Sequence, residues 1–173
     1  MSTPFIEKDL ELEEEAKRHI IALLEKYGCK TLDLSEPKEL SKTPFPIPLK
    51  KAMKNCLKTK FDLFVARTHL NEWYIVETKG KRLEKWKTWV NQNSYNAYWK
   101  IASFPSPFLY LIWIKENNKI YRHDVIDPKN FEKDFKRRMP IYYIPENLIH
   151  EFKPEWIKRL DLCFEIEDVE QLF

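Results

Sequence analysis

Glycine, cysteine and long uncharged segments are all scarce in this sequence. It has two glycines and three cysteines, and the cysteines are widely spaced and form no CxxC pair. This pattern argues against a disulfide framework or a structural zinc site and favours a reducing cytoplasm. No apolar run is long enough to cross a bilayer, and the acidic N-terminus "MSTPFIEKDLELEEE" lacks the apolar segment of a signal peptide. We therefore expect a cytoplasmic protein with no membrane partner.

A strong charge of one sign is also missing, because 30 Lys and Arg are nearly balanced by 27 Asp and Glu. The formal net charge of +3 is only a weak indication of an anionic partner, so any basic surface must come from local clusters. The sequence does have 43% hydrophobic and 14% aromatic residues over 173 positions. This composition and length predict one folded domain with its own core.

Apolar periodicity predicts a mixture of helices and strands. A helix is expected from about Glu7 to Tyr27, followed by a short strand in "KTLDLS", a loop in "SEPKELSKTPFPIP" and a basic amphipathic segment in "LKKAMKNCLKTK". Alternation predicts a hairpin of strands 61–67 and 73–79. A helix over about 83–101, a buried central strand in "PFLYLIWI" and its hairpin partner in "NNKIYRHDVI" follow. Two short helical patterns, "NFEKDFKRRM" and "PENLIHEFKPEWIKRL", end the chain. This order predicts an α/β fold with a mixed central sheet flanked by helices.

Three charged residues lie within the otherwise apolar strands of the predicted hairpin. Alternation places Asp62 with Phe64 on one face of the first strand, and Glu77 with Lys79 on one face of the second. The side chains of Glu77 and Lys79 are then about 7 Å apart on the same side of the sheet. Because paired strands lie roughly 4.8 Å apart, we expect Asp62 to converge on the same place. The simpler alternative is a solvated sheet face with a cross-strand ion pair.

A fourth charged residue, Glu13, lies close to the centre of the apolar stripe of the first helix. Glu14 lies at the edge of the stripe and remains a competitor for the same role. The alternative for Glu13 is an ordinary ion pair with Lys17, four residues further along the helix.

An Asp on one strand, a Glu-x-Lys ending the next and a Glu on the preceding helix resemble the PD-(D/E)XK nuclease superfamily. The matching residues are Asp62 in "FDLFV", Glu77-Thr78-Lys79 in "YIVETKGK", and Glu13. Phe61 stands where the motif's name has proline. Gln92, in the next helix, resembles a polar position that many members have there. The layout over about residues 7–124 is most similar to archaeal Holliday-junction resolvases and related restriction-type nucleases.

This resemblance implies a restriction-endonuclease-like core of order αβββαβ. The chain would be a single nuclease-like domain over 1–173, with a core over about 7–124 and a C-terminal helical extension over about 125–173. It would be an Mg²⁺- or Mn²⁺-dependent endonuclease that hydrolyses DNA phosphodiester bonds, and we expect a homodimer, which suits a cut in both strands of a symmetric substrate.

The resemblance also implies roles for individual residues. Hard oxygen ligands suit these ions, so Asp62, Glu77 and the Thr78 backbone carbonyl would bind the metal, with Glu13 bound directly or through water. Lys79 would orient the attacking water or stabilise developing negative charge, and Gln92 would be a secondary positioning residue. For Gln92, an ordinary polar surface residue is the alternative.

Basic residues cluster on both sides of the motif. The candidate contacts to DNA phosphates are Lys58, Lys60, Lys81, Arg82 and Lys85. The alternative is that these residues only form solvated helix faces, as basic clusters often do. "FKRRM", at Phe135–Met139, is a further candidate contact. Two other functions remain open, namely an inactive nuclease-fold protein that only binds nucleic acid, and an interaction protein with no nucleic-acid role.

Overall fold

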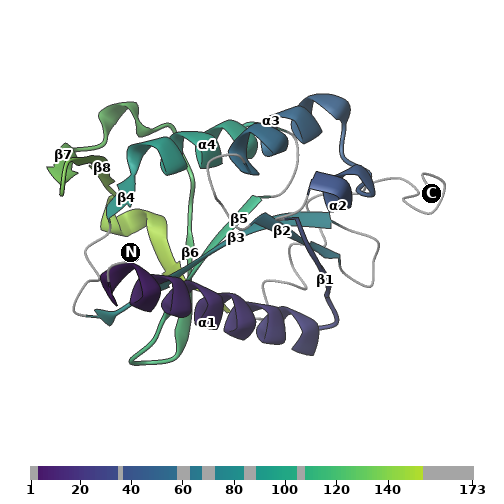
Figure 1. The fold of residues 1–173 in the computed structure, drawn as a ribbon, viewed down its shortest axis with the longest axis horizontal. Helices are drawn as coiled ribbons and strands as arrows, with labels where there is room; N and C mark the ends of the chain where they lie inside the picture. The colour runs from purple at the N-terminus through teal and green to yellow at the C-terminus, as the bar shows by residue number, and fades with distance from the viewer. Residues whose placement is uncertain are drawn as a thin grey trace.

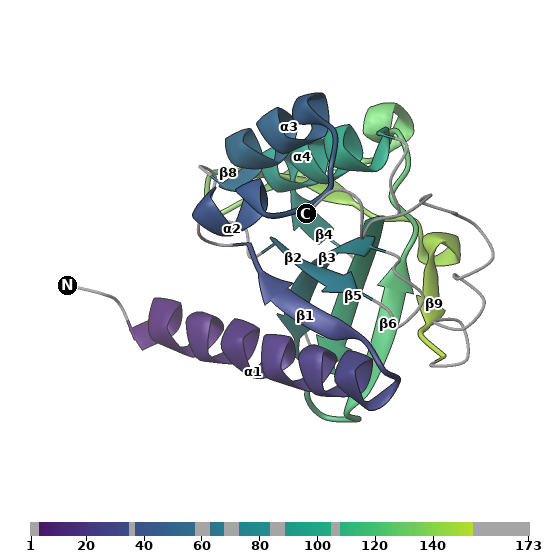
Figure 2. The same ribbon diagram turned by 90° about the vertical axis from the view of Figure 1, so that its right-hand side faces the viewer.

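The computed structural model describes residues 4–34, 37–57, 63–67, 73–83, 89–104 and 108–153. They form three layers, with a sheet between helices (Figures 1 and 2). The long helix α1 (Pro4–Lys26) covers one face of the sheet. The helices α2 (Pro37–Ser41), α3 (Ile47–Leu57) and α4 (Gln92–Ala102) lie on the other side. The predicted α/β class, with a mixed sheet flanked by helices, is confirmed.

The central sheet has the strand order β1-β2-β3-β5-β6-β9 within the described ranges. Neighbours pair antiparallel except β3 and β5, which run parallel and are connected through α4. Its strands are β1 (Lys30–Asp33), β2 (Leu63–Arg67), β3 (Trp73–Lys81), β5 (Phe108–Ile114), β6 (Lys119–His123) and β9 (Ile149–Glu151). The predicted helix over 7–27, the strand in "KTLDLS", the hairpin strands and the central apolar strand are all present.

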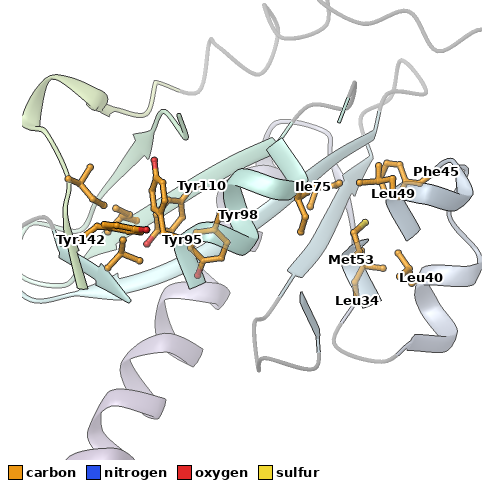
Figure 3. Packing of buried hydrophobic residues seen from close by; sticks show 14 of the residues in the cluster. Leu34, Leu40, Phe45, Leu49, Met53, Ile75, Tyr95, Tyr98, Tyr110 and Tyr142 are labelled. Atoms are coloured by element: carbon orange, nitrogen blue, oxygen red, sulfur yellow. The ribbon is translucent and has the colours of Figure 1, made fainter. Parts of the chain in front are cut away.

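The two faces of β3 contribute to separate halves of the core. Trp73 and Ile75 pack with buried residues of α3 and α4, whereas Tyr74 and Val76 pack against α1. Figure 3 shows the first half, in which Tyr95, Tyr98, Tyr110 and Tyr142 gather at one end and aliphatic side chains around Ile75 at the other. The alternation of a strand buried on both faces therefore divides the core into an α1 side and an α4 side.

A second, three-stranded sheet follows the order β4-β8-β7. Its strands are β4 (Trp89–Asn91), β7 (Lys133–Lys136) and β8 (Met139–Tyr143). The predicted helix over 83–101 is wrong over residues 89–91, because these pair with β8 and the helix begins only at Gln92. The Asn91 side chain accepts hydrogen bonds from the backbone N–H groups of Asn93 and Ser94. This N-cap fixes the start of the helix, which apolar periodicity cannot do.

The predicted helical extension over 125–173 is wrong for its described part, 125–153. Apart from the short 3₁₀ turns Pro128–Asn130 and Glu146–Leu148, this part is made of strands and loops. Phe131 and Phe135 have the four-residue spacing of a helix, but Phe131 is buried while Phe135 is 71% exposed. Prolines at 128, 140 and 145 also disfavour a continuous helix. β9 pairs with β6, so the described end of the chain extends the central sheet.

The segment "SEPKELSKTPFPIP" was expected to be a loop, but it contains the short helix α2. Pro37 is the first helical residue, a position where the missing N–H removes no helical hydrogen bond. Within the described ranges, none of the helices combines the length and apolar character needed to cross a membrane.

Candidate active site

The candidate site lies at the end of β3, beyond the last described pairing between β2 and β3. The described ladder between β2 and β3 ends at the pair Leu63–Glu77. The ladder between β3 and β5 continues as far as Lys81–Ile114. The last residues of β3 therefore extend beyond the described part of β2 while β5 still holds them.

Glu77 is fully buried on the α4 side of the sheet, with 0% of its surface exposed. The hydroxyl of Tyr98 on α4 donates a hydrogen bond to Glu77 Oε1 at 2.8 Å. Tyr110 is the parallel-strand neighbour of Glu77 on β5. Burial raises the pKa values of Tyr98 and Tyr110 well above the usual value for tyrosine, and the charge of Glu77 raises them further. Both hydroxyls are therefore protonated at neutral pH, and that of Tyr98 holds the Glu77 carboxylate in one orientation.

Lys79 connects β3 to α1 on the other face of the sheet. Its Nζ lies 2.9 Å from Glu13 Oε1, with 22% of the Lys79 side chain and 39% of the Glu13 side chain exposed. Strand alternation would place Lys79 on the same face as Glu77, opposite to α1. The contact with Glu13 nevertheless brings the Lys79 ammonium group to α1. A glutamate and a lysine 66 positions apart are thus brought together near the end of β3.

The structure distinguishes Glu13 from its neighbours on α1. Glu14 is exposed, and Glu15 accepts a hydrogen bond from Lys115 Nζ at 2.8 Å. Lys17, the alternative partner of Glu13, donates to Asp33 Oδ2 at 2.7 Å. Glu13 is therefore the α1 carboxylate that contacts the Glu-x-Lys segment, as its phase in the apolar stripe predicts.

Lys81 extends the row of lysines on β3 toward the small sheet. Its Nζ lies 4.4 Å from the ring centroid of Trp89 on β4, and Lys136 Nζ lies 4.6 Å from the same ring. Burial, together with the charges of Lys79 and Lys136, lowers the pKa of Lys81 to about 8, while the charges of Glu13 and Asp9 oppose the shift. Lys81 therefore lies among both basic and acidic groups near the end of β3.

Of the remaining predicted site residues, three are described by the structure and four lie outside the described residues. Thr78 is 5% exposed and Arg82 is half-buried beyond the end of β3. Gln92 donates from Nε2 to the backbone carbonyl of Ile141 at 3.0 Å, a contact that attaches the start of α4 to β8. The other predicted residues lie outside the described residues: Lys58, Lys60, Asp62 and Lys85.

Sequence reasoning missed Tyr98, Tyr110 and Trp89 as parts of this site. Tyr98 and Trp89 lie in a segment predicted to be one helix, and no local pattern connects Tyr110 with Glu77. Lys136 belongs to the candidate contact "FKRRM", but its segment was predicted to be helical, so its position beside Lys81 was not foreseen. Finding these residues would have required knowing which strands pair over long distances in the chain, and no local sequence pattern gives that information.

Comparison with known proteins gives no match to a family model, to a curated protein or to a solved structure. Among the residues that the structure describes, no three His, Cys, Asp or Glu side chains gather closely enough to hold a metal ion. The described carboxylates at the site are those of Glu13 and Glu77.

Proposed function

We propose that this protein is a metal-dependent nuclease that hydrolyses DNA phosphodiester bonds. The observation that carries the proposal is the arrangement at the end of β3. There, a fully buried carboxylate, Glu77, lies two residues from Lys79, whose ammonium group contacts Glu13 from the opposite layer. A buried carboxylate is costly unless hydrogen bonds or cations compensate it. A catalytic site for an anionic substrate supplies a reason to retain these charges.

The topology of the central sheet supports the proposal. A helix, three antiparallel strands, a helix and a parallel strand follow in the order α1, β1, β2, β3, α4 and β5. This is the αβββαβ order that the resemblance to the PD-(D/E)XK superfamily implies, with α2, α3 and β4 added between its parts. The Glu-x-Lys segment lies in the last half of the third of these strands, two residues before it ends at Lys81.

The donors at the site suit Mg²⁺ or Mn²⁺ in kind, because carboxylate oxygens are the ligands that these ions prefer. Glu77, Asp62 and the Thr78 carbonyl would hold the ion, with Glu13 as a direct or water-mediated ligand. When bound, the ion would activate water and neutralise charge on the phosphate.

The residues of the chain would supply the positioning. The Tyr98 hydroxyl fixes one oxygen of Glu77. Glu13 holds the Lys79 ammonium near the end of β3, where it would orient the attacking water or stabilise negative charge that develops on the phosphate. This ammonium also reduces the repulsion between the carboxylates.

The register of the sheet sets a condition on Asp62. In the described ladder Leu63 faces Glu77, and directly paired residues share a face of the sheet. A ladder continued by one residue would put Asp62 opposite Thr78, on the α1 side, away from Glu77. The proposal therefore requires the chain to depart from this ladder at Asp62, so that its carboxylate meets that of Glu77 near the end of β3.

A cleavage assay with matched lysine variants tests the proposal. Lys79→Met and Lys115→Met each break an ion pair to an α1 glutamate, at 2.9 Å and 2.8 Å respectively. Both pairs are partly exposed, so each loss should change stability by about 1 kcal/mol or less. Duplex, branched and single-stranded DNA are incubated with each variant in Mg²⁺, Mn²⁺ or EDTA.

We expect metal-dependent cleavage by the wild type and by Lys115→Met. A loss of about 100-fold or more is expected for Lys79→Met, the size typical of removing one group that stabilises transition-state charge. Asp62→Asn and Glu77→Gln should abolish cleavage. Salt-sensitive binding without cutting would instead identify an inactive nuclease-fold protein, and equal activity of the two lysine variants would remove Lys79 from the mechanism.

A further inference from the structure

The hairpin of β7 and β8 is a basic projection of the small sheet that the nuclease proposal leaves without a role. Residues 133–143, here called the basic hairpin, contain Lys133, Lys136, Arg137 and Arg138 against the single acidic residue Asp134. Lys133, Arg137 and Arg138 are exposed and Lys136 is half-buried. Figure 1 shows β4, β7 and β8 at the same end of the molecule as the N-terminal end of α1.

The tip of the basic hairpin places two arginines in an unusual backbone conformation. Lys136 pairs with Met139, so Arg137 and Arg138 form a two-residue turn. Their φ angles are 49° and 65°, as in a type I′ turn, in which both central residues have positive φ. Such turns favour Asn-Gly, because a side chain other than that of Gly, Asn or Asp strains this conformation. Arginine is thus present although it is unfavourable for the turn itself.

The basic hairpin is continuous with the candidate active site. Lys136 and Lys81 lie over the same Trp89 ring, at 4.6 Å and 4.4 Å from its centroid. Lys81 is two residues from Lys79 on β3. The charges of Lys79 and Lys136 both lower the pKa of Lys81, as expected of ammonium groups held close together. A row of cations therefore runs from Lys79 near the end of β3 to the arginines at the hairpin tip.

Acidic groups also lie along this row, and the charge of one of them, Asp9, raises the pKa of Lys81. Asp134 accepts hydrogen bonds from the Tyr143 hydroxyl at 3.0 Å and from its neighbour's backbone N–H at 2.7 Å. Glu13 is paired with Lys79. Phe135, next to Lys136 and 71% exposed, adds an aromatic ring that points to the other face of β7.

We propose that the row formed by Lys79, Lys81, Lys136, Arg137 and Arg138 is the path of the DNA backbone, with the basic hairpin binding phosphates that flank the scissile bond. The inference rests on the proposed nuclease function for the identity of its ligand. Guanidinium and ammonium groups spaced along a surface match the repeated negative charges of a phosphate backbone. The aromatic ring of Phe135 is available to contact a base or a sugar beside that path.

The turn permits a test that removes charge while favouring the backbone conformation of the tip. The double variant Arg137→Asn/Arg138→Gly introduces the sequence that a type I′ turn prefers. If the arginines do not contact DNA, this variant should bind DNA as tightly as the wild type does. Lys26→Gln/Lys30→Gln is the matched control, because it removes two exposed charges at the far end of α1 (Figure 1).

Binding of a fluorescein-labelled DNA duplex is followed by anisotropy in EDTA, over a range of NaCl concentrations. The slope of log K against log salt is negative, and each lost phosphate contact makes it shallower by about 0.9, so two lost contacts make it shallower by about 1.8. The electrostatic contribution of the two contacts to affinity vanishes near about 1 M salt. At about 0.15 M salt the affinity of the variant should therefore be about 30-fold lower than that of the wild type. The Lys26/Lys30 control should stay within about threefold of the wild type.

An affinity of Arg137→Asn/Arg138→Gly within about threefold of the wild type, with an unchanged salt slope, would overturn the inference. So would a wild-type chain that binds no DNA. Cleavage in Mg²⁺ is scored separately on the same samples. A wild type that binds but does not cut contradicts the nuclease proposal alone, since the affinity loss of the hairpin variant would still support the backbone path.

Discussion

Gly80 gives the sharpest prediction about how α1 and β3 are held together beside the candidate site. A Cβ atom at this position would lie 2.5 Å from the backbone oxygen of Leu12 on α1 and 2.9 Å from Leu12 Cγ. Ordinary contacts of a Cβ begin near 3.4 Å, so Gly80→Ala requires α1 to move away by roughly 0.9 Å. The clashing atom belongs to the helix backbone, so a side-chain rotation cannot relieve it.

The expected effect of Gly80→Ala is a loss of about 1 to 3 kcal/mol in the free energy of unfolding, the usual range for overpacking. The shift would loosen the buried α1 residues Leu12, Ala16 and Ile20, which are 0–8% exposed. Replacing glycine with alanine restricts the unfolded chain and by itself stabilises by about 0.4 to 1 kcal/mol. A net loss therefore means that the clash exceeds this gain.

Urea denaturation of Gly80→Ala, Leu12→Ala and the double variant checks this reasoning. Truncating Leu12 removes its Cγ but leaves its backbone oxygen in place, so the double variant should be less stable than Gly80→Ala. Gly80→Ala should also reduce cleavage, because a displaced α1 carries Glu13 away from Lys79. If Gly80→Ala unfolds within about 0.5 kcal/mol of the wild type, with an unchanged dependence on urea, the close approach of α1 and β3 is refuted.

Four other side chains give predictions that one measurement each can check. Tyr98→Phe removes the hydroxyl that donates to Glu77, so urea denaturation at pH 7 should show a loss of about 1 to 3 kcal/mol. Burial and neighbouring lysine charges lower the pKa of Lys81 to about 8 in the folded chain, whereas the ordinary pKa of lysine is 10.5. Between these two pH values the Lys81 amine is protonated more fully in the unfolded chain than in the folded one. Stability should therefore rise with pH above about 8, and Lys81→Met should flatten this rise when it is measured up to about pH 9.5, below tyrosine ionisation. Burial lowers the pKa of His123 to about 4, and neither ring nitrogen has a hydrogen-bond partner among the described residues. Stability should fall by about 3 kcal/mol as pH drops from about 6.5 to 4, because only the unfolded chain gains the proton there, and His123→Leu should remove most of this loss in acid denaturation. Phe135→Ser should leave the melting temperature unchanged, because the ring is 71% exposed, and should weaken binding to single-stranded DNA about tenfold in an anisotropy titration.

The sequence by itself determined the elements whose apolar residues repeat with one clear period. The four-residue spacing of Ala16, Ile20 and Leu24 predicts α1, and all three are buried. The unbroken apolar run of β5 predicts a strand covered on both faces, which is its position beside β3. The two-residue spacing of Glu77 and Lys79 on one strand was likewise visible, because strand alternation needs no knowledge of the partners.

Only the tertiary structure decided which side chains meet at the end of β3. Glu13 reaches Lys79 and Tyr98 reaches Glu77 because α1 and α4 pack on opposite faces of one strand. Likewise, β4 and the basic hairpin form because residues 89–91 and 133–136 both pair with β8, overriding a local helical pattern. Pairing between distant strands is a property of the whole packed chain, whereas periodicity reports only on neighbours within a few residues. The chemistry of the individual residues was therefore readable from the sequence, and their assembly into one site depended on the fold.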